Sequence, residues 1–254
     1  MHMYMETEGT PIIRLDGVSA GYEGKAVVES ASFSVYERDF LGIIGPNGGG
    51  KTTLLKVMMG LIGPMEGSVD YFDGGRSVGK IPMGYLPQYS SIDRKFPISV
   101  AEVVESGLGN ADIRRSVRRS MVAEAVAEFG LEAVAGRSIG SLSGGQLQRT
   151  MLARAVVSRP RVVLLDEPST YIDQRRQEEL YTLLGEINRT TAVVMVSHDV
   201  GTVLQCVKNV ACVAGTVHYH PSAEITGEHL SEAFGCPIEI LGHGGLPHRI
   251  LKQH

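Results

Sequence analysis

Residues 45–52 read Gly45-Pro46-Asn47-Gly48-Gly49-Gly50-Lys51-Thr52, which fits the pattern G-x-x-x-x-G-K-[ST] of a phosphate-binding loop. Its glycines have no Cβ, so successive backbone N–H groups can turn inward and form a concave nest for phosphate oxygens. The Lys51 ammonium can reach the β- and γ-phosphates, and the Thr52 hydroxyl can hold Mg²⁺. The segment is therefore predicted to bind a nucleoside triphosphate.

The residues on both sides of this loop predict a buried strand that leads into a helix. Leu41 to Ile44 are mostly apolar, as in a short core strand, and residues 52–59 show a helical pattern that Gly60 ends. The loop would then lie at a helix N-terminus, where the dipole and the free N–H groups favour an anion. Strand, loop and helix together indicate the core of a P-loop NTPase.

The composition is that of a globular protein without overall basic character. The chain has 254 residues, is 43% hydrophobic and carries a net charge of −4, so nothing global indicates nucleic acid as a partner. Its longest apolar runs, 162–165 and 192–196, are too short to cross a bilayer. Residues 1–11 contain two glutamates and no apolar run, so we expect no secretory signal there. Three cysteines lack metal-ligand spacing and are expected to be reduced thiols, as in a cytosolic protein: Cys206, Cys212 and Cys236.

Strand and helix patterns alternate along the chain. Residues 12–18 alternate between apolar and polar and predict an edge strand, and residues 27–35 predict an antiparallel strand. Further strands are predicted at 68–72, 81–86, 162–165 and 192–197, and helices at 99–107, 112–130, 147–158 and 174–188. We therefore expect an α/β fold: a P-loop NTPase core with a mostly parallel sheet, an antiparallel β subdomain and a helical insertion. Ligands of such a sheet bind at the C-terminal ends of its strands.

This pattern divides the chain into three regions. Residues 12–87 and 160–220 form the predicted ATPase core with its antiparallel β subdomain, residues 88–159 form a helical subdomain, and residues 221–254 form a tail. Six of the eight histidines lie from His218 onward. Imidazole suits Zn²⁺, but no pair has clear i, i+4 ligand spacing. Contacts with solvent or with a partner are the simpler interpretation of these histidines, and metal binding is the alternative.

Side chains suited to phosphate chemistry follow several of the predicted strands. Asp166 and Glu167 come directly after residues 162–165: Asp166 is placed to hold Mg²⁺, and Glu167 to orient or deprotonate an attacking water. His198 follows another core strand and is a candidate contact for a γ-phosphate. Gln88 precedes the helical insertion and is a candidate ligand of Mg²⁺ or of the lytic water. The structural alternatives are a helix cap or salt bridge for Asp166 and a polar linker residue for Gln88.

A second glycine-rich helix start lies at residues 142–146, which read Leu142-Ser143-Gly144-Gly145-Gln146. Ser143 is a good N-cap, and the free N–H groups behind it form another anion cradle. One nucleotide cannot use both cradles fully if they lie on separate lobes of one chain. A head-to-tail two-fold dimer, in which each cradle completes the site of the other chain, solves this problem.

The order and spacing of these motifs resemble the ATP-binding subunit of ABC (ATP-binding cassette) transporters. The resemblance covers nearly the whole chain: residues 45–52 match the phosphate loop, Gln88 the Q-loop, residues 142–146 the signature, Asp166 and Glu167 the Walker B end, residues 169–173 the D-loop, and His198 the switch histidine. Tyr22 matches the aromatic residue that stacks on adenine. The catalytic residues implied are Glu167, His198 and Gln88, and those implied for Mg²⁺ are Thr52, Gln88 and Asp166. The residues implied for ATP are Tyr22, Gly45, Pro46, Asn47, Gly48, Gly49, Gly50, Lys51, Thr52, Thr53, Ser143, Gly144, Gly145, Gln146 and Asp173.

The resemblance also implies a function and partners. ATP and Mg²⁺ would be the cofactors, and closure of a head-to-tail homodimer on ATP, followed by hydrolysis, would drive a separate integral membrane permease. The chain would then sit at the cytoplasmic face of the membrane. Residues 96–100, Phe96-Pro97-Ile98-Ser99-Val100, and the histidine-containing segments from His218 resemble bacterial zinc/manganese-type importers, which implies an extracytoplasmic metal-binding protein in the same system and no nucleic acid.

Two departures from the family pattern and several alternatives accompany this interpretation. Tyr171 stands in the D-loop where a small residue is usual, and Gly49 stands where Ser or Ala is commoner, which is expected to loosen the loop. The alternative functions are an ABC subunit for a siderophore or cobalamin, an exporter subunit, and a soluble ABC ATPase that acts on nucleic acid or ribosomes. A basic helix face is expected to be solvated, or alternatively to contact anionic lipid or a partner: Arg114, Arg115, Arg118 and Arg119.

Overall fold

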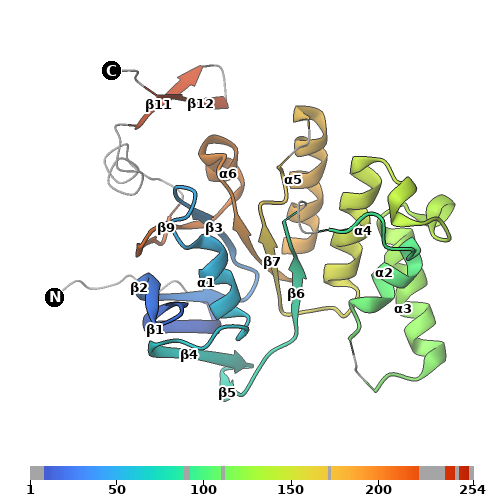
Figure 1. Cartoon of the computed structure of the whole chain (residues 1–254), viewed down its shortest axis with the longest axis horizontal. Coiled ribbons are helices and arrows are strands. Elements are labelled where there is room, and N and C mark those ends of the chain that lie inside the picture. Colours follow the sequence, from blue (N-terminus) through green and yellow to red (C-terminus); the bar gives the residue numbers. More distant parts are fainter. Residues whose placement is uncertain are drawn as a thin grey trace.

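The computed structural model describes residues 9–88, 92–109, 112–170 and 173–222, together with the backbone of residues 238–243 and 246–251 (Figure 1). Its strands are β1 (Pro11–Tyr22), β2 (Lys25–Tyr36), β3 (Phe40–Ile44), β4 (Glu66–Asp73), β5 (Arg76–Val78), β6 (Met83–Leu86), β7 (Val162–Asp166), β8 (Ala192–Val196), β9 (Asn209–Ala214), β10 (Thr216–His220), β11 (Ile238–His243) and β12 (Leu246–Leu251). Its α-helices are α1 (Lys51–Met58), α2 (Val100–Ser106), α3 (Arg115–Glu128), α4 (Gly144–Val156), α5 (Gln174–Asn188) and α6 (Val200–Cys206).

A large sheet organises the described part of the chain, with the strand order β5-β4-β1-β2-β10-β9-β3-β8-β7-β6. Strands β9, β3, β8, β7 and β6 are parallel neighbours, which confirms the predicted α/β class. Their C-terminal ends line up, because Asp166 pairs with Val196, and Ile43 pairs with the same Val196. The loops that follow β3, β7 and β8 therefore meet at one edge of the sheet, as expected for a ligand site.

Two hydrophobic cores cover the two faces of the parallel strands. Successive side chains of a strand point to opposite faces, so Val163 and Leu165 of β7 pack with the helices α2 to α6, whereas Val162 and Leu164 pack with α1 and the antiparallel strands. All of these side chains are buried. Burial on both faces explains why these strands are continuous apolar runs rather than alternating ones.

The antiparallel strands correct one prediction about the fold. Residues 12–18 were expected to form an edge strand, but β1 pairs with β2 on one side and with β4 on the other. The apolar alternation shows which face of a strand is buried, but it does not show whether both hydrogen-bonding edges are occupied. The short strand β5, which the sequence pattern did not predict, occupies the edge instead.

The chain between β6 and β7 is mainly helical, as predicted. Figure 1 shows α2, α3 and α4 grouped at one end of the molecule, and β1, β2 and β4 at the other. Helix α5 has the predicted bounds of 174–188, and α4 begins at Gly144, behind the predicted N-cap Ser143. The sequence pattern did not predict α6, β9 or β10. The division into residues 12–87 with 160–220, 88–159 and 221–254 stays a prediction.

Surface features and the tail complete this description. Within the predicted basic face, Arg114, Arg115 and Arg119 are exposed, whereas Arg118 lies 3.9 Å from Glu105 in an ion pair. Tyr171, most of the histidine-containing tail and Cys236 lie outside the described residues. In the described ranges, none of the helices combines the length and the apolar character needed to cross a membrane.

Candidate nucleotide-binding site

The loop between β3 and α1 forms a cradle that only glycine permits at two of its positions. Gly45 has φ +153°, and a Cβ built there would lie 1.9 Å from the Val213 carbonyl oxygen. Gly50 has φ +102°, and its Cβ would lie 2.6 Å from Val28 Cγ2 and 2.9 Å from the Val27 carbonyl oxygen. The backbone of this loop therefore approaches its neighbours too closely for any side chain.

Gly49 is packed from behind rather than free. A Cβ there would lie 2.8 Å from the Val213 carbonyl oxygen and 3.0 Å from that of Pro46. The Gly49 carbonyl accepts a hydrogen bond of 3.1 Å from the Gly215 N–H, in the turn between β9 and β10. The structure thus explains glycine at position 49 by lack of space, and the predicted loosening of the loop stays a prediction.

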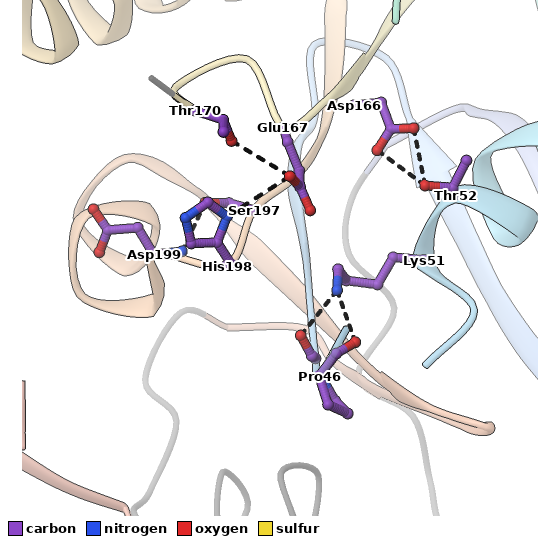
Figure 2. Close-up of polar contacts among 10 residues, drawn as sticks. Pro46, Lys51, Thr52, Asp166, Glu167, Thr170, Ser197, His198 and Asp199 are labelled. Atoms are coloured by element: carbon purple, nitrogen blue, oxygen red, sulfur yellow. Dashed lines mark hydrogen bonds and ion pairs between the residues drawn. The ribbon is translucent and has the colours of Figure 1, made fainter. Parts of the chain in front are cut away.

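Lys51 is held inside this loop (Figure 2). Its ammonium donates hydrogen bonds to the carbonyl oxygens of Gly45, at 3.0 Å, and Pro46, at 2.8 Å. The side chain is only 6% exposed, and this burial lowers the pKa of the Lys51 ammonium, while the carboxylates of Glu167 and Asp166 oppose the shift. The Lys51 ammonium therefore lies at the loop, where phosphate oxygens could replace the two carbonyl oxygens as its hydrogen-bond acceptors.

Thr52 and Asp166 meet at the first turn of α1 and the end of β7 (Figure 2). The Thr52 hydroxyl lies 2.9 Å and 3.2 Å from the two Asp166 carboxylate oxygens. Asp166 is 1% exposed, and burial raises the pKa of its carboxyl, although the Thr52 hydrogen bond lowers it. A buried carboxylate beside a hydroxyl gives two adjacent oxygen ligands, which is the donor set that Mg²⁺ prefers.

Glu167 leaves β7 in a strained backbone conformation. Its φ is +52°, and its N–H donates to the Val196 carbonyl oxygen at 3.1 Å. Glu167 Oε2 lies 3.3 Å from the Thr170 hydroxyl and 3.8 Å from His198 Nδ1, so these side chains converge on one carboxylate oxygen (Figure 2). A non-glycine residue in this region costs on the order of 1–3 kcal/mol, and such strain clusters at functional sites.

One open cavity of about 470 Å³ brings together many of the predicted site residues. It is lined by Val27, Asn47, Gly48, Gly50, Lys51, Thr52, Thr53, Gln88 and Glu167. Gln88 therefore reaches the phosphate loop from the end of β6, as its position in the sequence suggested. Val27 was not predicted as a lining residue, because nothing in the sequence shows that β2 runs beside the loop.

Tyr22 lies outside this lining, at the end of β1. Its side chain is 46% exposed, its hydroxyl accepts a hydrogen bond of 3.4 Å from Lys56 Nζ, and the same ammonium lies 5.8 Å from the ring centre. An exposed aromatic ring beside the Lys56 ammonium of α1 offers a surface on which a planar base can stack.

The second glycine-rich segment opens into a different cavity. Ser143 caps α4, because its hydroxyl accepts from the Gln146 N–H at 3.3 Å while Gln146 Oε1 accepts from the Ser143 N–H at 3.0 Å. Ser143 and Gly145 line a cavity of about 820 Å³ against α5, separate from the one at the phosphate loop. Asp173 caps α5 through a hydrogen bond of 3.1 Å from the Arg176 N–H. Among the described residues, Ser143 and Gly145 therefore do not line the cavity that Lys51 lines, although Gly144 shares a smaller cavity with Glu167.

A profile of the family described as ABC transporter matches residues 28–170. This chain belongs to the ABC transporter family. The match covers more than half of the chain and confirms the resemblance that the motifs predicted. With it come ATP binding and ATP hydrolysis, which define the ATP-binding subunits of this family.

Several curated relatives of the chain are named as metal transport proteins. The chain is 42% identical to a probable metal transport system ATP-binding protein of Chlamydia pneumoniae, over 70% of this chain and 76% of the relative. It is 34% identical to the zinc import ATP-binding protein ZnuC of Saccharophagus degradans, over 86% of this chain and 82% of the relative. Among solved structures, a chain described as part of a metal-chelate type ABC transporter in an inward-facing conformation aligns with a TM-score of 0.82 at 23% identity, over 96% of this chain and 98% of that chain. At this identity the structural likeness shows the fold alone.

Proposed function

We propose that this chain is the ATP-hydrolysing subunit of an importer for a divalent metal ion, zinc or manganese. The contact between Thr52 and Asp166 carries the proposal, because it sets two oxygen ligands for Mg²⁺ at the edge of a glycine cradle. The cargo class is supported by the sequence likeness to the metal transport proteins of Chlamydia pneumoniae and Saccharophagus degradans.

The residues at the loop fit ATP and Mg²⁺. Val213 leaves no room for a side chain at Gly45, and Val27 and Val28 leave none at Gly50, so the loop presents bare backbone to a ligand. The Lys51 ammonium supplies a cation for the β- and γ-phosphates. Thr52 and Asp166 would hold the metal ion, with Gln88 reaching the same cavity. Bound Mg²⁺ would neutralise negative charge that develops on the phosphate oxygens.

Glu167 is the residue that we assign to the attacking water. Its carboxylate lines the phosphate-loop cavity, where it can accept a proton from water. Thr170 and His198 face the same oxygen, Oε2, and so restrict the orientation of the carboxylate. His198 is half exposed, which leaves its ring available for a γ-phosphate contact.

A second copy of the chain is needed to complete each site. Ser143 and Asp173 lie at helix N-termini away from the phosphate-loop cavity of their own chain. In a head-to-tail dimer, residues 143–146 of one chain would face the phosphates bound at Lys51 of the other, and Tyr22 would stack on the adenine. Residues 88–159 would form the subdomain that presents Ser143.

The proposal includes the rest of the transport system. An integral membrane permease would hold this chain at the cytoplasmic face of the membrane, an extracytoplasmic protein would deliver the metal, and no nucleic acid would take part. The chain itself need not touch the cargo, and the described residues contain no cluster of three metal-ligating side chains.

Glu167→Gln tests the hydrolytic assignment. Removal of a general base lowers turnover by about 10²–10⁴-fold, while the neutral isostere leaves the nucleotide cradle unchanged. We expect the variant to bind ATP with wild-type affinity and to elute as a stable dimer with ATP in gel filtration, where the wild type does not. Turnover within twofold of the wild type would remove Glu167 from this role.

Uptake into proteoliposomes tests the cargo. The complex of this chain with its permease and metal-binding protein, purified from membranes, is given ATP inside the vesicles and radioactive zinc, manganese, a ferric siderophore or cobalamin outside. We expect ATP-dependent uptake of zinc or manganese, and none with Glu167→Gln. Uptake of only the siderophore or cobalamin would reject the proposed cargo while leaving the ATPase assignment intact.

A further inference from the structure

Arg94 joins the segment after Gln88 to the turn before Ser143. Its guanidinium Nη2 donates a hydrogen bond of 2.6 Å to the Leu142 carbonyl oxygen and a longer one of 3.4 Å to the Gly140 carbonyl oxygen. Arg94 is half-buried, and a charged donor on a carbonyl gives a stronger bond than a neutral one. This side chain therefore links two loops that are far apart in sequence.

The Leu142 carbonyl is one end of a peptide unit whose other end is the Ser143 N–H. That N–H donates to Gln146 Oε1 at 3.0 Å. The peptide unit is planar, so hydrogen bonds to its carbonyl and to its N–H together fix its orientation. The direction in which the Ser143 side chain leaves the backbone is set by this plane, and thus in part by Arg94.

Backbone packing holds the same two segments together. A Cβ at Gly140 would lie 2.6 Å from the Arg94 carbonyl oxygen, so these two segments of the chain touch without room for a side chain. The Ile139 N–H also donates to the Ile98 carbonyl oxygen at 3.0 Å. Residues 94–98 and 139–142 therefore form a continuous packed seam, and the contact of Arg94 with residues 140–142 is part of it.

We propose that Arg94 is a positioning residue that aligns Ser143 for the nucleotide bound to the second copy of the chain. The inference rests on the proposed function, in which Ser143 completes the site of the other chain. A lysine at this position would keep the charge, but its flexible ammonium lacks the planar guanidinium that holds Nη2 between the two carbonyl oxygens.

Arg94→Ala is the first variant, and Lys95→Ala is its matched control. Lys95 is the next residue, carries the same charge and is exposed; its backbone N–H bonds to Asp93, and it makes no hydrogen bond to residues 140–142. We expect Arg94→Ala to lower kcat for ATP at least tenfold while the Kd of the monomer for ATP stays within twofold. Lys95→Ala should leave both values within twofold of the wild type.

The combination with Ser143→Ala separates positioning from general destabilisation. If Arg94 acts through Ser143, then Arg94→Ala added to Ser143→Ala causes no further loss of kcat, because linked residues give non-additive effects. Gly140→Ala, which pushes on the same seam, should lower kcat in the wild type and not in Ser143→Ala. Losses that multiply in the double variants would overturn the inference.

The remaining outcomes are also decisive. Wild-type kcat in Arg94→Ala, with Ser143→Ala inactive, overturns this inference alone. Wild-type kcat in Ser143→Ala overturns the two-chain site and the inference with it. If Arg94→Ala does not fold, Arg94→Lys replaces it in the single variant and in the combination with Ser143→Ala. Its melting temperature is then compared with that of Lys95→Ala.

Discussion

Gly49→Ala tests whether the phosphate loop is packed tightly from behind. The new Cβ would lie 2.8 Å from the Val213 carbonyl oxygen and 3.0 Å from that of Pro46, whereas ordinary contacts begin at 3.4 Å. Both neighbours are backbone atoms, so the loop or strand β9 must move. Overpacking of this kind costs about 1–3 kcal/mol. Alanine also lowers the conformational entropy of the unfolded chain, which offsets about 0.4–1 kcal/mol of this destabilisation.

The two ranges combine to a net destabilisation of about 0–2.6 kcal/mol, centred at about 1.3 kcal/mol, which for a chain of this size lowers the melting temperature by roughly 3–5 °C. Differential scanning fluorimetry with and without ATP measures it, and ATP affinity should fall with it because the cradle moves. Gly63→Ala is the control, since no atom lies within 4 Å of its Cβ. If Gly49→Ala melted at or above the wild type and bound ATP more tightly, the packing argument would be wrong, and the loosening expected from the sequence would be correct.

Two further predictions concern Asp166 and Tyr22. Burial raises the pKa of the Asp166 carboxyl in the folded protein above its unfolded value of 3.8. The ionised carboxylate therefore destabilises the apo protein at pH values above the raised pKa, and this effect disappears as the pH falls below 3.8. Asp166→Asn should therefore melt higher than the wild type at pH 7 without Mg²⁺, should approach it as the pH falls toward 3.8, and should lose Mg²⁺-dependent ATP affinity. If Asp166→Asn melted at a lower temperature than the wild type at pH 7, the Asp166 charge would not destabilise the apo protein and the prediction would be wrong. Tyr22→Ala should raise the KM for ATP about tenfold with kcat unchanged, because stacking contributes about 1–3 kcal/mol per base. An unchanged KM in steady-state assays would place the adenine elsewhere.

Local features of this protein followed from its sequence, whereas pairings between distant segments did not. The bounds of α5 and the cap at Ser143 were predicted, because helix periodicity and capping depend on neighbouring residues. The phosphate loop and Asp166 were found for the same reason, since each follows a recognisable strand.

Some errors and omissions involve partners that are remote in sequence, whereas β5 and β10 are short strands of local hairpins. β1 was placed at an edge because its alternation does not reveal β4, and β10 was missed because its short run pairs with β9 and touches β2. The packing of Gly49 depends on Val213, and the position of Leu142 depends on Arg94. A single sequence carries no signal that these residues meet.

The position of β3 in the sheet has a consequence for biosynthesis. Its two neighbours are β8 and β9, and the turn beyond β9 supplies the Gly215 N–H that supports Gly49. A ribosome makes β3 and the phosphate loop before it makes β8 and β9, the two strands that flank β3 in the sheet. We therefore expect ATP to stabilise the folded loop only after residues 192–215 have been made, because a ligand stabilises the state that binds it.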